Sequence, residues 1–224
     1  MRSVLSAMLY YLNANETLPR LAPVYHLQVT ESDDIGLLST LANQSRAEIR
    51  RRLANDNNAY VAFYKNQPAA FGWSSSGKAV IGELSHELIL PLGHKYLWNF
   101  RTIDNFRGLG IYPQLLQHIV RSEGHTTERF WILHAPENTS SQKGILKAGF
   151  KFISEVSVKN LDQVIVSNHT FHYSAELHAM GFSPSGEPHA TCWTCSSPYL
   201  SHKKTGCCCT TSGKLCNEKQ FLSA

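Results

Sequence analysis

The sequence predicts a mixed α/β fold in which a mostly antiparallel central sheet is flanked by helices. Between residues 60 and 103, short apolar and aromatic runs separated by turn residues predict a meander of antiparallel strands. Between residues 96 and 135, an apolar run, a glycine turn, an amphipathic run and a second apolar run predict one local crossover, which is right-handed by rule. Hydrophobic residues make up 42% of the 224 residues, which is enough to build a core.

The first part of the chain is expected to contain one strand and two short helices. Residues 24–30 have the composition of a strand, and a helix with an apolar face follows from near Ser32. A second helix is expected to open at Ser45, because Ser45 and Glu48 have the spacing of a capping box. We interpret the basic run at residues 50–52 as the solvated face of this helix rather than as a binding patch.

Two hairpins are expected next in the chain. The first joins residues 60–64 to residues 69–73 through a turn at residues 65–68. The second joins residues 84–90 to residues 96–103 through the sequence Pro-Leu-Gly-His, which is typical of a tight turn.

The segment NFRGLGIYP, at residues 105–113, is the most informative in the chain because it joins an apolar run to an amphipathic one. Such a strand–turn–helix unit points backbone N–H groups and the positive end of a helix at one spot, which makes an anion site. Pro113 suits the first position of a helix over residues 113–122, where no N–H is needed. The ligand expected at this turn is the pyrophosphate of a nucleotide-like cofactor.

The last part of the main domain is expected to hold a buried strand over residues 129–135 and a short helix over residues 140–148 that Gly149 ends. A final hairpin is expected from residues 150–158 and 164–167. From about residue 183 Ser, Pro, Gly, Thr and Cys dominate and the periodicity disappears. We therefore predict a main domain over residues 1–180 and a Cys-rich C-terminal tail over residues 181–224.

Composition and charge argue against several classes of protein. The net charge is +4 with scattered basic residues, so no nucleic-acid partner is expected. No run approaches the roughly 18 apolar residues that a membrane helix needs, so no membrane partner is expected. Residues 4–12 have the length of a signal-peptide core, but one basic residue precedes them and no small-x-small cleavage site is obvious after them.

All six cysteines lie in the predicted tail. Because the first 191 residues contain none, a cytoplasmic location is the default expectation. The tail has one Cys-x-x-Cys pair and four further cysteines, and the full set is Cys192, Cys195, Cys207, Cys208, Cys209 and Cys216. Zinc binding, disulfide bonding and a reduced, loosely ordered tail all stay open, and no metal ligand is assigned.

Two motifs in the main domain resemble those of the GNAT superfamily of acyltransferases. The family's signature is Gln or Arg, two residues, Gly, one residue, then Gly or Ala, after its fourth strand. Here Arg107 and Gly110 fit this signature, while Tyr112 stands where the last small residue is expected. Downstream, the run Asn-Thr-Ser-Ser from Asn138 and the run Lys-Ala-Gly-Phe at residues 147–150 resemble the family's asparagine-led helix and its closing motif. The resemblance covers residues 24–167.

The resemblance implies an N-acetyltransferase that takes acetyl-CoA as co-substrate and acylates a primary amine of a small molecule or peptide. It implies that acetyl-CoA binds between two strands that splay apart, of which residues 96–103 form one. The residues it implies as cofactor contacts are Thr102, Ile103, Arg107, Gly108, Leu109, Gly110, Ile111, Tyr112, Asn138 and Ser141. A homodimer stays open, as does the alternative that Asn138 is an ordinary helix N-cap.

One departure from the family concerns the acid that protonates the departing thiolate. Many members carry a Tyr seven residues after this Asn, and here Ile145 stands at that position. The substitutes are Tyr112, Ser141 or a water molecule. A thiolate is a fair leaving group, because free thiols titrate near about 8.5.

The other departure is that no carboxylate lies on the strand at residues 96–103 to deprotonate the amine. If the turn of the second hairpin is centred after Leu92, His86 lies opposite Asn99 and the next residue, Glu87, lies opposite Trp98. We therefore predict His86 as the base, with Glu87 and His134 as alternatives. A non-catalytic CoA-binding or regulatory module is the second function that stays open, and a zinc-stabilised interaction tail is the third.

Overall fold

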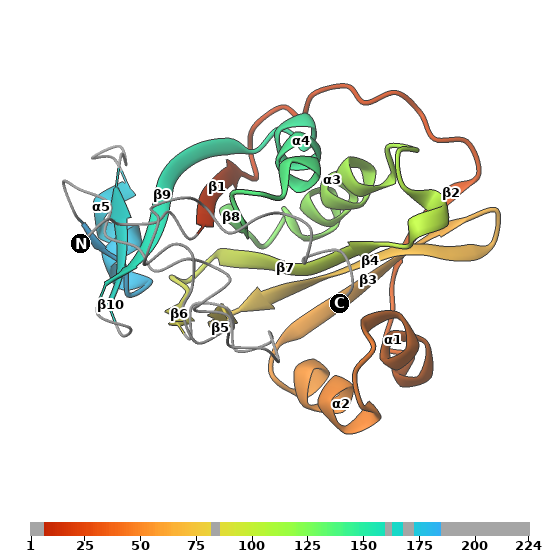
Figure 1. The fold of residues 1–224 in the computed structure, drawn as a ribbon, viewed down its shortest axis with the longest axis horizontal. Helices are drawn as coiled ribbons and strands as arrows, with labels where there is room; N and C mark the ends of the chain where they lie inside the picture. The colour runs from red at the N-terminus through yellow and green to blue at the C-terminus, as the bar shows by residue number, and fades with distance from the viewer. Residues whose placement is uncertain (1–6, 82–85, 160–162, 168–172, 185–224) are drawn as a thin grey trace, which may run out of the picture.

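The computed structural model describes residues 7–81, 86–159, 163–167 and 173–184 (Figure 1). The helices are α1 Ile35–Ala42, α2 Arg46–Ala54, the 3₁₀ turn η2 Asp104–Phe106, α3 Ile111–Glu123, α4 Thr139–Ala148 and α5 Ser174–Ala179. The strands are β1 Ala7–Asn13, β2 Leu27–Glu31, β3 Asn57–Tyr64, β4 Gln67–Ser76, β5 Lys78–Ile81, β6 His86–Ile89, β7 His94–Thr102, β8 Arg129–His134, β9 Lys151–Lys159, β10 Gln163–Ser167 and β11 Ser183–Pro184.

Nine of these strands form one sheet in the order β11-β10-β9-β1-β8-β7-β4-β3-β2, and β5 and β6 form a separate two-stranded sheet. Neighbours in the large sheet are antiparallel except for β7 with β8 and β10 with β11. The predicted fold class, a mixed and mostly antiparallel sheet flanked by helices, is confirmed. The predicted Cys-rich tail lies outside the described residues, apart from its first four positions.

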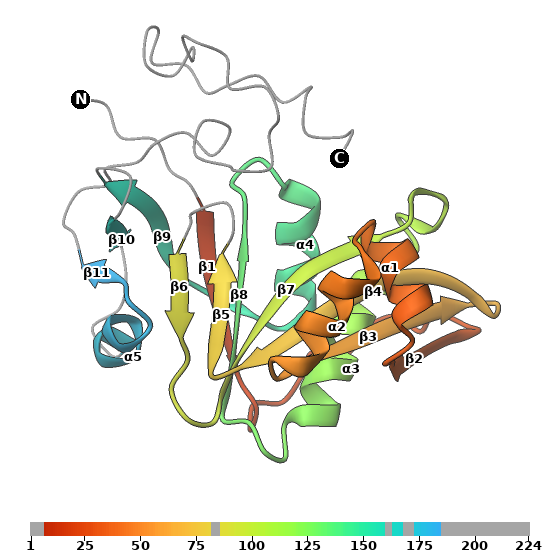
Figure 2. The ribbon, with the colours of Figure 1, turned by 90° about the horizontal axis from the view of Figure 1, so that it is seen from below.

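Helices α3 and α4 cover one face of the sheet, and α1 and α2 cover the β3–β4 half of the other face (Figure 1). The β5–β6 hairpin packs on the remaining half of that second face, over β1 and β8 (Figure 2). Each layer buries apolar side chains against the sheet. Leu115 and Ile119 of α3 and Leu88 of the hairpin point into the core, and Phe71 of β4 is covered by α1 and α2. Both faces of the central strands are therefore removed from water.

Strand β1 was not predicted, although it lies at the centre of the sheet. It pairs antiparallel with β8 on one side and with β9 on the other. Alternate residues face opposite layers, since Leu9 packs under the β5–β6 hairpin while Tyr10 packs under α4. The apolar run that has the length of a signal-peptide core is thus a buried strand from residue 7 onward. The first predicted strand begins later than expected, at Leu27.

The second predicted hairpin is wrong. The turn at residues 91–94 exists, with the N–H of His94 donating to the carbonyl of Pro91 at 3.0 Å. However, β6 pairs with β5, with His86 opposite Ile81, and β7 pairs with β4 and β8. The unpredicted strand β5 competes for β6, and β7 finds a longer partner in the ten-residue strand β4.

The helix ends follow local capping chemistry. The Ser45 hydroxyl accepts the N–H of Glu48 at 3.1 Å, while the Glu48 carboxylate binds arginines of its own helix rather than closing a capping box. Helix α3 begins two residues earlier than predicted, with Gly110 as its N-cap, so Pro113 occupies the third helical position. The proline costs no hydrogen bond there, because the first four N–H groups of a helix lack intrahelical partners.

A buried carboxylate ties the end of α3 to three strands. Glu123 accepts hydrogen bonds from Asn58 Nδ2 at 2.9 Å, Tyr60 at 2.9 Å and Ser74 at 2.6 Å, and pairs with Lys95 at 3.1 Å. Burial, and then the neighbouring Glu123 charge, raise the pKa of Tyr60. Because each Glu123 oxygen has two partners, this network holds α3 over β3, β4 and β7 and so fixes the direction in which the N-terminus of α3 points.

Candidate functional site

The parallel strands β7 and β8 separate part of the way along the sheet. They pair only from His94 to Leu97 on β7 and from Arg129 to Ile132 on β8. Beyond these residues β7 continues alongside β4, while β8 runs in a different direction (Figure 2). In the described part of the chain, the edge of β7 that faces β8 has no strand partner beyond Leu97. We call this gap the opening.

A β-bulge in β7 lies at the start of the opening. Two steps along β4, from Phe71 to Trp73, correspond to three steps along β7, from Arg101 back to Trp98. Asn99 takes a left-handed backbone with φ of 50°. A bulge of this kind bends its strand and increases the local twist, which turns β7 away from β8. The side chain of Phe100 lies directly over Gly72, where any Cβ would come within 2.0 Å of the ring.

The glycine turn follows the end of β7 and leads into α3. Gly108 and Gly110 both have positive φ, of 81° and 78°, and no heavy atom lies within 4 Å of a Cβ built on Gly108. Residues 107–110 are exposed, so the turn is accessible. Arg107 pairs with Asp104 at 2.8 Å on the outside of this turn. An exposed turn at the N-terminus of a 13-residue helix is a suitable place for an anion.

The predicted contacts at the end of β7 already have partners within the protein. The carbonyl of Thr102 accepts from Arg107 Nε at 3.3 Å, and the N–H of Ile103 donates to the carbonyl of Ala69 at 2.8 Å. Both residues lie beside the opening, and their contact with a cofactor stays a prediction.

Tyr112, the second residue of α3, lies beside the opening, between Phe100 of β7 and α4. Its ring lies 5.5 Å from the ring of Phe100, and its hydroxyl lies 3.4 Å from the hydroxyl of Ser141 on α4. It also packs on Gly144, where a Cβ would come within 2.3 Å of the Tyr112 ring. Burial raises the pKa of Tyr112, so the phenol keeps its proton at neutral pH.

The N-terminus of α4 lies at the far side of the opening. The Asn138 side chain accepts the N–H of Ser141 at 2.9 Å, so it is the N-cap of α4. Its binding to a pantetheine arm stays a prediction. Ile145 is fully buried in the core beneath α4, and its apolar side chain has no proton to donate.

The structure does not bring His86 to the opening as the sequence predicted. Its Nε2 lies 3.1 Å from the carbonyl of Met180, and its ring packs on Phe182 at 5.1 Å between centroids. Because a carbonyl only accepts, Nε2 carries the proton. The register that paired His86 with Asn99 is wrong, so the reason for predicting His86 as the base no longer holds. The alternative Glu87 is exposed and pairs with Lys78 at 3.0 Å.

His134, the last residue of β8, is held by a series of hydrogen bonds beneath α4. Its Nδ1 donates to the carbonyl of Ala135 at 2.7 Å, and its Nε2 therefore accepts from the Tyr10 hydroxyl at 3.1 Å. The Tyr10 oxygen in turn accepts from Gln142 Nε2 at 3.2 Å. Burial lowers the pKa of His134 and keeps the imidazole neutral. Both ring nitrogens are satisfied, which is the arrangement of a structural histidine.

On the side of α1 and α2, Arg52 packs on Trp98 at the start of the opening and on the buried Trp73 of β4. The Arg52 guanidinium lies 4.8 Å from the ring centroid of Trp98 and 5.5 Å from that of Trp73. It also binds Glu48 at 2.9 Å. The side chain of Arg52 is 12% exposed, against 66% for Arg51. The interpretation of residues 50–52 as a wholly solvated face is therefore wrong for Arg52.

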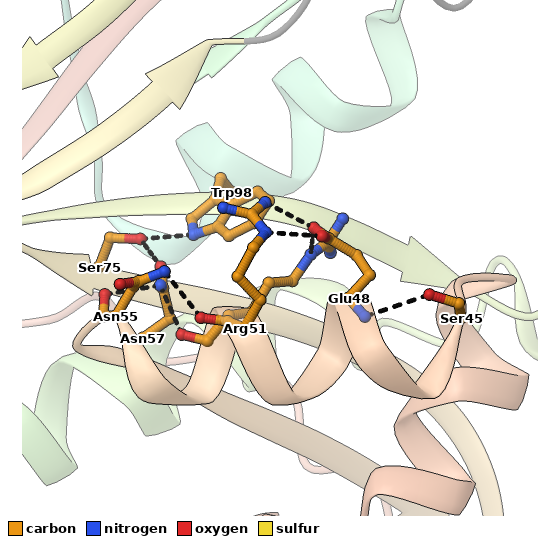
Figure 3. Close-up of polar contacts among 8 residues, drawn as sticks. Ser45, Glu48, Arg51, Asn55, Asn57, Ser75 and Trp98 are labelled. Carbon is orange, nitrogen blue, oxygen red and sulfur yellow. Dashed lines mark hydrogen bonds and ion pairs between the residues drawn. The ribbon is translucent and has the colours of Figure 1, made fainter.

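A chain of hydrogen bonds connects Trp98 with the end of α2 (Figure 3). The indole N–H of Trp98 donates to Ser75 Oγ at 2.7 Å, and Ser75 donates to Asn57 Oδ1. Asn57 Nδ2 donates to the carbonyl of Arg52 at 2.8 Å. Trp98 is the first residue of β7 beyond the last pair with β8, so α2 is connected to the point where the strands part.

Glu48 provides the negative charge next to Arg52, on the side of α1 and α2. Hydrogen bonds from Arg51, and then from Arg52, lower the pKa of its carboxyl from 4.5 to about 2, although burial opposes the shift. The spacing of Glu48 and Arg52, four residues apart on one helix, was visible in the sequence as an ion-pair signal. The contact of Arg52 with two tryptophans from different strands was not, because it depends on the sheet.

The described residues contain no helix that is long and apolar enough to cross a membrane. Within the same ranges no three His, Cys, Asp or Glu side chains come together in a way that could hold a metal ion. The cysteines considered for zinc lie outside them.

No protein-family model matches the chain, and no curated protein matches it. Solved structures do resemble it, and several of them are described as GNAT-family acetyltransferases. One, from Colwellia psychrerythraea, shares 15% identity over 66% of this chain and 53% of its own length, with a TM-score of 0.46. Another, from Elizabethkingia anophelis with acetyl-CoA bound, shares 16% identity over 59% of this chain and 80% of its own, with a TM-score of 0.44.

A third structure is AAC(6')-Iy in complex with the bisubstrate analogue CoA-S-monomethyl-acetylneamine. It shares 20% identity over 56% of this chain and 91% of its own, with a TM-score of 0.44. The names of the structures from Colwellia psychrerythraea and Elizabethkingia anophelis give the same family that the motifs at Arg107 and Asn138 resemble. The chain spans about half the length of the first of these proteins, at 53%.

Proposed function

We propose that the protein is an acyl-CoA-dependent N-acyltransferase that uses acetyl-CoA to acylate a primary amine. The opening between β7 and β8 is the observation that carries the proposal. It leads directly to the accessible glycine turn at residues 107–110 and the N-terminus of α3. A ligand with an extended arm and a pyrophosphate matches this arrangement, because the arm can pair with the free edge of β7 while the anion binds at the turn.

The acceptor amine enters from the side of α1 and α2 in this proposal. The other side is filled by the ring of Tyr112, which packs between Phe100 and Gly144. The amine nitrogen attacks the thioester carbon, and N–H groups on the free edge of β7 stabilise the developing oxyanion. The C–S bond then breaks and the CoA thiolate leaves. Most of the rate comes from holding the two substrates in place.

Tyr112 is the proton donor to the departing thiolate in this scheme. Its pKa is raised by burial, so it holds a proton to give, and Ser141 lies beside its hydroxyl at 3.4 Å. The proton that the amine loses returns to the phenolate through water. We assign no side chain as the base, since His86 lies elsewhere and His134 is fully hydrogen-bonded.

Two departures from the family favour a second function, a CoA-binding module without catalysis. Ile145 replaces the expected donor, and Tyr112 fills space where the family has a small residue. If the Tyr112 ring stays in place when CoA binds, the arm binds but the thioester does not reach the amine. A cytoplasmic location and a homodimer remain predictions under either function.

A thiol-release assay with acetyl-CoA over a panel of primary amines separates the two functions. We expect release with at least one amine above the rate of hydrolysis. Calorimetry of acetyl-CoA binding runs in parallel. Binding without turnover on any amine supports the module, and the absence of binding overturns both functions.

A further inference from the structure

A cavity of about 410 Å³ lies where the start of β2 meets the turn between β3 and β4, and no step of the proposed reaction uses it. It is lined by His26, Gln28, Lys65 and Asn66. All four lining residues are polar, and Lys65 brings a positive charge. The N–H of Lys65 donates to the carbonyl of His26 at 3.0 Å, so the two sides of the cavity are held together.

The cavity lies close to the glycine turn. A methyl of Val24 is 3.7 Å from the position of a Cβ on Gly110, and His26 follows two residues later. Two residues span at most about 7 Å of chain. From the other side, the ring of Tyr64 lies 6.0 Å from the ring of Phe106, which directly precedes Arg107. The Lys65 ammonium lies over that Tyr64 ring at 5.4 Å.

The segment between β1 and β2, which we call the strap (residues 14–26), is fixed to the helices. It arches over α4 and α3 before entering β2 (Figure 1). Gln117 Nε2 donates to the carbonyl of Pro19 at 2.8 Å, and Gln114 Nε2 donates to the carbonyl of Ala22 at 2.9 Å. At its end Val24 packs inward while the next side chain, Tyr25, is 76% exposed. The strap thus ends on an exposed aromatic residue that directly precedes His26, which lines the cavity.

The sheet order separates the cavity from the opening. The opening lies on the β8 side of β7, whereas the cavity lies on the opposite side, across β4 and β3 at β2. In CoA the pyrophosphate joins the pantetheine arm to an adenosine whose ribose carries a further phosphate. An adenosine that continues from the turn away from the opening would extend toward β2, where the cavity lies.

We propose that this cavity and Tyr25 bind the adenine nucleotide end of the cofactor. The Tyr25 ring stacks on the purine, and Lys65 with His26 binds the ribose phosphate. The proposal rests on the proposed function, because it places the far end of the same ligand. It also explains why a long segment before β2 is fixed along α3 instead of forming a short loop.

The test measures affinities by calorimetry for three compounds: CoA, dephospho-CoA, which lacks the ribose phosphate, and 4′-phosphopantetheine, which lacks the whole nucleoside. The wild type should bind CoA more tightly than 4′-phosphopantetheine. Tyr25→Ala should weaken CoA binding about tenfold, the effect of losing one base stack, and leave 4′-phosphopantetheine affinity unchanged. Tyr25→Phe, which keeps the ring, should bind CoA like the wild type.

Lys65→Gln should weaken CoA binding about threefold, the size of an exposed charge contact, without changing dephospho-CoA binding. Lys78→Gln is the matched control, since Lys78 is also exposed but lies on β5, in the separate two-stranded sheet. If the wild type binds CoA and 4′-phosphopantetheine equally well, or Tyr25→Ala weakens both alike, this proposal is overturned while the proposed function stands. If the wild type binds none of the three compounds, the proposed function itself fails.

Discussion

The two sides of the opening are built by different physical means. On the side of α3 and α4 the contacts are steric, because the ring of Tyr112 lies between Phe100 and the bare backbone of Gly144. On the side of α1 and α2 the contacts are electrostatic, because the Arg52 guanidinium lies between tryptophan rings and the Glu48 carboxylate. The first side is therefore sensitive to a single methyl group, and the second to charge and pH.

This difference matters for the proposed reaction. A phenol held by packing alone, with a long 3.4 Å contact to Ser141, can change rotamer when a ligand arrives. A guanidinium that stacks on Trp98 and binds Glu48 is held by several interactions at once, and moving it breaks all of them. We expect the side of α3 and α4 to adapt to the cofactor, and the side of α1 and α2 to keep its shape for the acceptor.

The largest expected effect is on turnover in Tyr112→Phe. Removing the hydroxyl leaves the ring packing intact but removes the proposed acid, which should slow turnover about 10²-fold. Acetyl-CoA affinity, measured by calorimetry, should stay within about twofold, because the stacking contacts remain. If affinity falls and turnover at saturation does not, Tyr112 is a packing residue and the acid lies elsewhere.

The second largest expected effect is a loss of stability in the Gly144→Ala variant. The added methyl would lie 2.3 Å from the Tyr112 ring, so either the ring or α4 must move. Overpacking of this kind costs about 1–3 kcal/mol in the free energy of unfolding, measurable by urea denaturation. The double variant Gly144→Ala with Tyr112→Ala should recover part of this loss, because the clashing ring is gone. A double variant that is simply the sum of two losses would contradict the steric reading.

A smaller effect is expected when the other side is changed by Arg52→Ala. The loss of stacking on two tryptophans and of the ion pair should cost about 1–2 kcal/mol in the free energy of unfolding. Arg51→Ala is the matched control, because Arg51 binds the same carboxylate from a side chain that is 66% exposed. It should change stability by at most about 0.5 kcal/mol. Equal losses for the two variants would show that stacking on Trp98 contributes nothing.

The smallest expected effect is on the pH dependence of stability in Glu48→Gln. Folding lowers the Glu48 pKa from 4.5 to about 2, so its contribution to stability is complete above pH 4.5 and is lost as the pH falls toward 2. Glu48→Gln should therefore be less stable than the wild type at pH 7, with a difference that shrinks between pH 4.5 and 2. Urea midpoints of both proteins across this range provide the measurement. A difference that does not depend on pH would mean that the carboxyl acts by shape alone.

Local sequence signals predicted the elements around the site well. The helix predicted over residues 140–148 is present as Thr139–Ala148, with Asn138 as its N-cap, which was the open alternative, and with a left-handed Gly149. All three features depend on neighbours within four residues. The glycine turn was found for the same reason, since Gly108 and Gly110 are needed where the backbone has positive φ. The first residue of α3 was misjudged, because Pro113 is compatible with any position in the first turn.

Long-range pairing was beyond reach from the sequence. An apolar run such as residues 7–13 has no local partner, and its two neighbours lie far along the chain in β8 and β9. The wrong partner for β6 had the same origin, because a tight turn at residues 91–94 made the local hairpin look favourable. The misplacement of His86 followed from that single error, since a candidate residue is only as reliable as the strand register behind it.

The central position of β1 has a consequence for how the protein is made. During synthesis, at about 5–20 residues per second, the ribosome releases this strand on the order of ten seconds before β8 emerges, and β9 follows later still. Through that interval an apolar segment waits without either of the neighbours that it has in the folded sheet. Such a segment is a target for chaperones and for pairing with other nascent chains. The strand that lies between β8 and β9 is thus also one that must stay unpaired for a long time during synthesis without aggregating.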